Sequence, residues 1–151
     1  MKMARVMQIG LCVAPASSVG ADGRAGVPLY LYRISAGFPT RAGDYVEGRI
    51  DLNEWLIRNE PSTFIAKVEG DSMEPGIRSG DWLIVYRSLD AQHRDVIVAG
   101  SAEGAVVKRL LVEGGRAVLA SDNPAYPPVE VEGDEGLRVW GVVTYVVRRL
   151  R

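Results

Sequence analysis

Ser72 and Lys108 are the two residues whose types and surroundings could perform catalysis together. Ser72 lies in the segment VEGDSMEP, residues 68–75, and Lys108 lies in the apolar segment AVVKRL, residues 105–110. A serine hydroxyl is a weak nucleophile until a neighbouring base takes its proton, and a lysine that has lost its hydration can be that base. The pair therefore predicts hydrolysis by a Ser/Lys mechanism.

Glycines on both sides of Ser72 indicate a tight turn. Gly70 and Gly76 bracket the serine, and a turn between them would expose the hydroxyl and aim backbone N–H groups at one point, as in an oxyanion hole. The alternative is that Ser72 caps a helical turn formed by the residues that follow it. The segment also lacks the second glycine of a nucleophile elbow, and the chain contains no Ser-x-x-Lys motif.

Lysine is rare in this chain, with three lysines against 15 arginines. Arginine stays charged and cannot act as a base, whereas a buried lysine can lose its proton. If residues 105–111 form a strand, Val106, Lys108 and Leu110 share one face, where desolvation would lower the pKa of the lysine. The alternative is a strand lysine whose amine reaches water. His93, in a polar turn, is the other candidate base.

Ala36-Gly37 is the candidate substrate bond within the chain itself. Both side chains are minimal, so an extended segment could lie deep in a cleft, and Phe38 and Pro39 would stiffen the chain that follows. The chain is therefore predicted to cut itself between residues 36 and 37.

Short strands separated by glycine-rich turns predict a mainly β fold. Asp51 and the residues after it resemble a helix start, which predicts one short helix over residues 51–59 that Pro61 closes. Residues 1–36 are predicted to form a flexible N-terminal arm, and residues 37–151 the compact domain. The predicted strands are residues 29–32, 63–68, 82–86, 95–99, 105–112, 116–120, 129–131 and 137–147.

Composition restricts the class of protein. The chain has 151 residues, 47% of them hydrophobic and 25% charged, which is typical of a globular domain. A net charge of −1 argues against a nucleic-acid-binding surface. Cys12 is the only cysteine, so no intramolecular disulfide is possible; with a single histidine, no metal site is expected. We expect a cytoplasmic protein without a cofactor.

Seven short segments, in this order and spacing, resemble the S24 self-cleaving proteins, the family that includes LexA and UmuD. The likeness covers roughly residues 28–151 and is greatest to the UmuD-like members. These segments are AGFP (36–39), DYVE leading into IDLN (44–53), GDSM (70–73), GDWLIV (80–85), VKRL (107–110), NPAY (123–126) and VWGVV (139–143).

The resemblance implies roles for particular residues and partners. It makes Ser72 the nucleophile, Lys108 the general base and Ala36-Gly37 the scissile bond, and it places the backbone N–H groups of Asp71 and Ser72 in the oxyanion hole. It also implies a compact β domain like the C-terminal domain of LexA, a homodimer, and cleavage in the SOS response stimulated by RecA on single-stranded DNA. The truncated form would then serve an error-prone translesion polymerase, UmuC.

Two other functions stay open. One is a non-catalytic dimeric module that docks on a polymerase or a RecA filament, and the other is a relative of signal peptidase. A DNA-binding repressor is disfavoured because residues 1–36 show no helix-turn-helix pattern. Cleavage at Ala36-Gly37 that depends on Ser72 would separate the peptidase from the interaction module.

Overall fold

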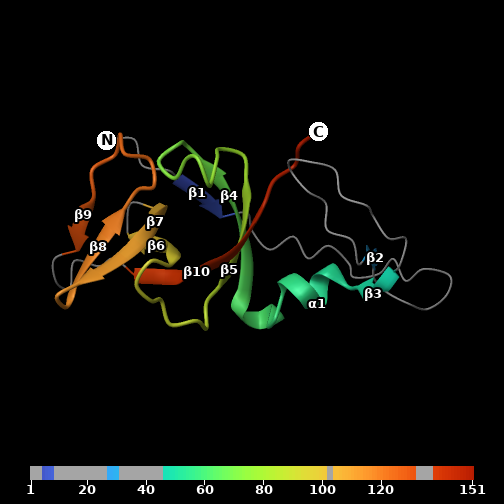
Figure 1. The fold of residues 1–151 in the computed structure, drawn as a ribbon. Helices are drawn as coiled ribbons and strands as arrows, with labels where there is room; N and C mark the ends of the chain where they lie inside the picture. The colour runs from blue at the N-terminus through green and yellow to red at the C-terminus, as the bar shows by residue number, and fades with distance from the viewer. Residues whose placement is uncertain (1–4, 9–26, 31–45, 102–103, 132–137) are drawn as a thin grey trace. The chain divides into compact units, whose positions relative to one another are not determined.

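The structure is a computed structural model that describes residues 5–8, 27–30, 46–101, 104–131 and 138–151 (Figure 1). The chain divides into two compact units. One unit comprises residues 1–12 and 59–151, and the other comprises residues 13–58. The candidate catalytic residues both lie in the first unit.

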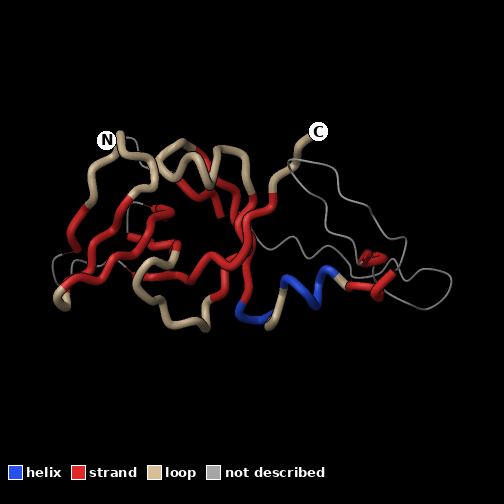
Figure 2. The backbone as a smooth tube through the Cα atoms, viewed as in Figure 1, coloured by secondary structure: helices blue, strands red, loops and turns tan. Residues whose placement is uncertain are grey.

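The first unit is built around an eight-stranded antiparallel sheet (Figure 2). A 3-10 helix (Glu60–Ser62) leads into its second strand. The strand order is β1-β4-β5-β10-β6-β7-β8-β9. The strands are β1 (Arg5–Gln8), β4 (Thr63–Glu69), β5 (Trp82–Tyr86), β6 (Val96–Ser101), β7 (Gly104–Glu113), β8 (Arg116–Ala120), β9 (Val129–Val131) and β10 (Arg138–Val147).

The sheet curls back on itself because β1 pairs with two strands. It pairs with β4 along its whole length, and Arg5 also pairs with Val106 of β7. The strands from β1 to β7 in this order therefore form a closed ring, while β8 and β9 extend beyond β7. The first part of β7 faces β1 along one edge, and its later part, from Arg109 onward, faces β8 along that edge.

The β7–β8 hairpin has a fixed register. Its two turn residues, Gly114 and Gly115, have φ angles of 56° and 80°, which glycine adopts without strain and which a two-residue hairpin turn of type I′ requires. Glu113 therefore lies opposite Arg116, and the pairing continues to Arg109 opposite Ala120. This register carries Ser121, the next residue, to the position across from Lys108.

Apolar side chains pack on both sides of the sheet. The larger cluster of buried residues comprises Ala66, Val68, Met73, Ile77, Leu83, Val85, Val98, Ala105 and Val107. The smaller cluster comprises Ile97, Ala99, Leu110, Leu119 and Val142. Strand β7 contributes to both clusters, which is why every residue from 105 to 110 is buried or half-buried.

The second unit contains three described elements. Strands β2 (Val27–Tyr30) and β3 (Val46–Ile50) pair antiparallel, and α1 (Leu52–Leu56) follows them. The Asp51 side chain caps α1 by accepting a hydrogen bond of 2.8 Å from the Asn53 N–H. The predicted cap is therefore confirmed, but the helix ends three residues before the predicted end, because Ile57 already has an extended backbone.

The expectation of a mainly β domain with one short helix is confirmed. Two strands were not expected. Strand β3 was not predicted at all, and β1 lies within the predicted arm, as does β2. Each of these strands is only four or five residues long. Because each pairs with a segment far away in the sequence, its own residues give only a weak indication of a strand. The predicted boundary between residues 36 and 37 lies outside the described residues.

Gly141 is expected to be essential for packing β10 against β5. A Cβ atom at this position would lie 2.8 Å from Val85 Cγ1 and 2.9 Å from the backbone oxygen of Tyr86. Gly141→Ala should lower the free energy of unfolding by about 2 kcal/mol, because a backbone atom cannot move aside cheaply. Urea denaturation measures this, with Gly76→Ala as control, since its nearest atom would be 4.0 Å away. Equal stability of the two variants would contradict the predicted clash.

Candidate active site

Ser72 is held in a turn between β4 and β5 that is anchored in the core. Met73 and Ile77, on the same turn, are 1% and 5% exposed and belong to the larger apolar cluster. The Ile77 N–H donates to the Met73 oxygen at 3.0 Å and closes a single turn after Ser72, but Ser72 Oγ accepts no hydrogen bond from its N–H groups, so the alternative that Ser72 caps a helical turn is wrong. Ser72 itself is fully buried, and its Oγ has no hydrogen-bond partner among the described residues. A buried hydroxyl without a partner is costly, and such groups often mark functional sites.

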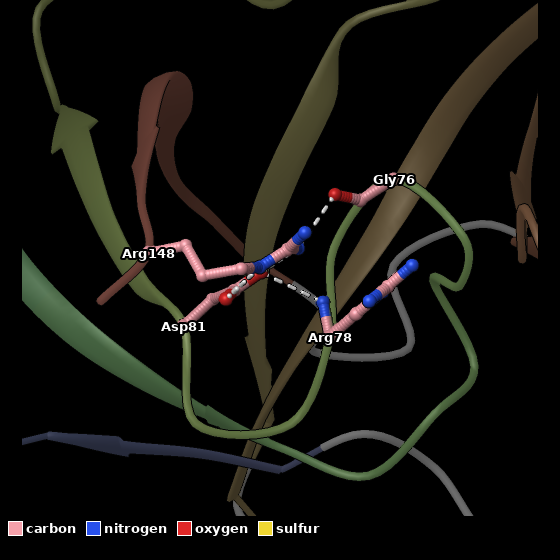
Figure 3. Close-up of polar contacts among 4 residues, drawn as sticks. All are labelled: Gly76, Arg78, Asp81 and Arg148. Atoms are coloured by element: carbon pink, nitrogen blue, oxygen red, sulfur yellow. Dashed lines mark hydrogen bonds and ion pairs between the residues drawn. The ribbon is translucent and has the colours of Figure 1, made fainter. Parts of the chain in front are cut away.

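A charged clamp fixes the far end of this turn (Figure 3). Asp81 is 2% exposed and accepts hydrogen bonds from Arg148 Nε at 2.7 Å and from the Arg78 N–H at 2.8 Å. Arg148 Nη2 also lies 2.5 Å from Asp81 Oδ2 and donates to the Gly76 oxygen at 3.1 Å. Arg148, just after β10, therefore ties two points of the serine turn together. Its hydrogen bonds hold the pKa of Asp81 below the ordinary value of 3.8.

Lys108 is buried on β7, at 5% exposure. The alternative with its amine in water is therefore wrong. Burial lowers the pKa of Lys108 below its ordinary value of 10.5, because the charged form loses hydration. Its Nζ donates a hydrogen bond of 2.5 Å to Ser121 Oγ and lies 5.7 Å from the centroid of the Tyr126 ring.

Residues 121–126, the first part of the connection between β8 and β9, join the lysine to the serine turn. The Asn123 N–H donates to the Ser72 backbone oxygen at 3.0 Å, and the Asn123 side-chain amide donates to the Asp71 oxygen at 3.0 Å. The Tyr126 hydroxyl donates to the Asp71 carboxylate. Ser72 and Lys108 thus both contact residues of this segment, although no hydrogen bond joins the two side chains directly.

Strand β7 also holds this connection in place through the residue after the lysine. Arg109 donates from Nε and Nη2 to the two carboxylate oxygens of Asp122, at 2.7 and 2.6 Å. A two-pronged contact of this kind fixes orientation as well as distance. The segment that carries Ser121 and Asn123 is therefore tied to β7 at the level of Lys108.

The backbone N–H groups of Asp71 and Ser72 are the candidate oxyanion donors. The backbone N–H groups of Asp71 and Ser72 donate to no described residue. Two neighbouring N–H groups at a turn that also carries a candidate nucleophile could form an oxyanion hole. Their aim relative to a bound peptide depends on residues 36 and 37, which lie outside the described residues.

His93 has a different role in the structure. It is exposed, and its Nδ1 accepts a hydrogen bond of 2.9 Å from the Val112 N–H. His93 therefore binds the backbone near the end of β7. Among the described residues, no hydrogen bond joins it to the Ser72 turn. Lys108 remains the better candidate base.

The structure adds Ser121 and Tyr126 to the residues that sequence reasoning assigned to the site. Tyr126 was part of a recognised segment, but no role was given to it. Ser121 was not considered, although the two-residue turn Gly114-Gly115 sets a register that places it opposite Lys108. The hairpin register was thus the signal that could have found it.

Neither a metal cluster nor a membrane helix is found in the part of the chain that the structure describes. No group of three or more His, Cys, Asp or Glu side chains there could hold a metal ion. No described helix is long and apolar enough to cross a membrane.

Comparison with known proteins decides the family. The family model described as Peptidase S24-like matches residues 28–144, which is most of the chain and includes both Ser72 and Lys108. The chain belongs to this family. The S24 peptidases include self-cleaving serine peptidases, in agreement with the chemistry that the sequence predicts.

Several curated proteins of this family are similar over most of their length. Protein MucA of Escherichia coli is 41% identical over 130 residues, which cover 85% of this chain and 88% of MucA. Protein SamA of Salmonella typhimurium is 38% identical, with 82% and 86% covered. The LexA repressor of an Anaeromyxobacter strain is 34% identical over 90% of this chain, but over only 60% of the repressor. The likeness to UmuD-like S24 proteins is thereby confirmed.

The Asp81–Arg148 clamp should make stability depend on pH. The folded pKa of Asp81 lies below its unfolded value, so the clamp stabilises the protein above about pH 4 and loses this effect as pH falls through the folded pKa. Asp81→Asn should therefore lower the free energy of unfolding by about 2 kcal/mol at pH 7 and by much less near pH 2. Urea denaturation at both pH values measures this, with the exposed Asp90→Asn as control. A deficit that is equal at both pH values would contradict the clamp.

Proposed function

We propose that this S24 peptidase cuts its own chain between Ala36 and Gly37 with Ser72 as nucleophile and Lys108 as general base. The observation that carries the proposal is the burial of the Lys108 amine beside the same connection that binds the Ser72 turn. Burial favours the neutral amine, which is the form that can accept a proton. Ser72 Oγ has no partner among the described residues, so its hydroxyl is available to donate a hydrogen bond to the neutral Lys108 amine.

The mechanism needs only groups of this chain and water. Neutral Lys108 takes the proton of Ser72 as its Oγ attacks the Ala36 carbonyl carbon, and the Asp71 and Ser72 N–H groups stabilise the oxyanion. The Lys108 ammonium then gives this proton to the Gly37 nitrogen as the peptide bond breaks. Water hydrolyses the remaining ester, with Lys108 again as the base. The products are residues 1–36 and 37–151.

The biological setting follows from the UmuD-like members of the family. Self-cleavage would occur in the SOS response to DNA damage, stimulated by a RecA filament on single-stranded DNA. Residues 37–151, as a homodimer, would then serve as a subunit of a UmuC-like translesion polymerase. The match to nearly all of MucA, against 60% of a LexA repressor, supports this role over a repressor.

A non-catalytic docking module is the second candidate. The eight-stranded sheet would serve it equally well, and no catalysis would be needed. A docking module has no reason to bury a lysine amine or to leave a buried serine hydroxyl without a partner, since both lower stability. The two residues therefore favour the peptidase.

Ser72→Ala should abolish cleavage and keep the fold. The wild-type protein, incubated at raised pH, should yield fragments 1–36 and 37–151 by intact mass under denaturing conditions. Ser72→Ala should yield neither, because no nucleophile remains, and its free energy of unfolding should rise by about 1–3 kcal/mol, since the variant removes a buried hydroxyl that has no partner among the described residues. Ser88→Ala, at an exposed serine, is the matched control. Cleavage of Ser72→Ala at the wild-type rate would exclude Ser72 as nucleophile.

Gly37→Glu should block cleavage, because a charged side chain would be buried without a partner in a cleft that fits Ala36 and Gly37. Unchanged cleavage of this variant, measured by intact mass, would show that the scissile bond lies at another position.

The cleavage rate should rise with pH until it reaches the lowered pKa of Lys108. Only the neutral amine accepts the Ser72 proton, so below the pKa the first-order rate should grow about tenfold per pH unit, and above it the rate should level off. Because burial lowers this pKa, the plateau should begin below 10.5. Lys108→Arg keeps the charge and should be inactive at every pH. A flat wild-type profile between pH 6 and 10 would argue against a lysine base.

A further inference from the structure

The base and the nucleophile each have an unexpected environment in the uncut chain. The Lys108 amine is bonded to the hydroxyl of Ser121, at 2.5 Å, rather than to that of Ser72. Ser72 Oγ is buried with no partner among the described residues. The Lys108 amine is therefore hydrogen-bonded to a second serine, while the Ser72 hydroxyl has no hydrogen bond to the proposed base.

We propose that Ser121 is a positioning residue that controls Lys108, holding its amine away from Ser72 until cleavage begins. This inference rests on the proposed function, since it assigns Lys108 the role of base. It adds a step to the reaction: the amine exchanges the Ser121 hydroxyl for the Ser72 hydroxyl, and Ser121 keeps its own proton throughout.

The backbone of the β7–β8 hairpin holds Ser121 next to Lys108. The β7–β8 ladder ends with Arg109 paired to Ala120, and Ser121 follows directly, so its side chain lies within hydrogen-bond distance of the Lys108 amine. Arg109 and Asp122, which follow Lys108 and Ser121 in the sequence, form an ion pair that holds the two segments together. The backbone of Ser121 is thus held beside Lys108, and the long lysine side chain, with its four rotatable bonds, is the group that can carry the amine from Ser121 to Ser72.

Two physical effects of the Ser121 hydroxyl act in the same direction. As an acceptor it stabilises the ammonium form, because hydrogen bonds to charged groups are stronger than those to neutral groups. As a donor it would occupy the single lone pair of the neutral amine, which is the electron pair that must take the Ser72 proton. Both effects reduce the fraction of Lys108 that is ready to act as base.

Other titratable groups near the amine are few among the described residues. The Tyr126 ring lies against it, and hydrogen bonding to Asp71 raises the pKa of Tyr126 above 10.0, so this phenol stays neutral below that pH. Asp71 is occupied by Tyr126, and Asp122 by Arg109. On the other side, Ile97 of β6 is the apolar neighbour of Lys108 in the ladder. Removal of the Ser121 hydroxyl should therefore change the pKa of Lys108 more than removal of any other of these polar groups.

The test compares the full-length protein with Ser121→Ala by two measurements. The first is the NMR titration of Lys108 in the uncleaved Ser72→Ala background, which is practical because the chain has only three lysines. The second is the pH profile of self-cleavage with Ser72 intact. We expect Ser121→Ala to lower the Lys108 titration midpoint by about one unit and to raise the cleavage rate at pH 7 about tenfold. Ser121→Thr, which keeps a hydroxyl, should restore the midpoint, and Ser88→Ala serves as control.

The two measurements separate the inference from the proposed function. A midpoint in Ser121→Ala that is unchanged or raised, or a cleavage rate that falls at every pH, would overturn the inference. If neither protein cuts itself while the midpoint falls by about one unit, the proposed function is overturned and the control of the Lys108 proton by Ser121 stands.

Discussion

Burial of the Lys108 amine is the constraint on which the rest of the candidate site depends. A charged amine in an apolar environment is unstable unless it loses its proton or gains a partner. Strand β7 creates this situation because it lies in the middle of the sheet, with Val107 packed in one apolar cluster and Leu110 in the other. The connection of residues 121–126 then relieves it by supplying the Ser121 hydroxyl and the Tyr126 ring. The same connection binds the Ser72 turn, so the environment of the proposed base and the position of the proposed nucleophile are coupled through one segment.

The serine turn is rigid because independent contacts hold it at three points. Met73 and Ile77 anchor it in the core, Arg148 and Asp81 clamp its far end, and Asn123 binds the backbone at Asp71 and Ser72. These contacts matter because the turn keeps a buried hydroxyl without a partner among the described residues, which typically costs about 1–3 kcal/mol. A protein that retains such a group at one place and fixes the surrounding chain so firmly has sacrificed stability for a specific geometry, as active sites commonly do.

The sequence predicted the local elements well and the long-range ones poorly. Strands β5, β8 and β9 have the bounds that were predicted, and β7 differs by one residue at each end, because apolar runs between glycine turns are a direct signal of strands. Strands β1 and β3 were missed because distant partners, rather than their own residues, make them strands. The period of two along β7 placed Lys108 on one face with Val106 and Leu110 but left open whether its amine reaches water, and the structure shows that Lys108 is buried because β7 packs on both of its faces. Ser121 required the register of a hairpin, and the Arg148 clamp joins residues 67 positions apart, which no local pattern could indicate.

The pairing of the short strands bears on what self-cleavage at Ala36-Gly37 would accomplish. Strand β1 precedes the proposed cut and pairs with β4 and β7, and β2, also before the cut, pairs with β3 after it. Hydrolysis of one peptide bond removes none of these backbone hydrogen bonds. The segment of residues 1–36 would therefore stay attached until its two strands unpair, and β1 would leave an exposed edge on β4 when it does. If the proposed cleavage occurs, the sheet edge that β1 leaves on β4, rather than the loss of the arm alone, would be the new surface of the product.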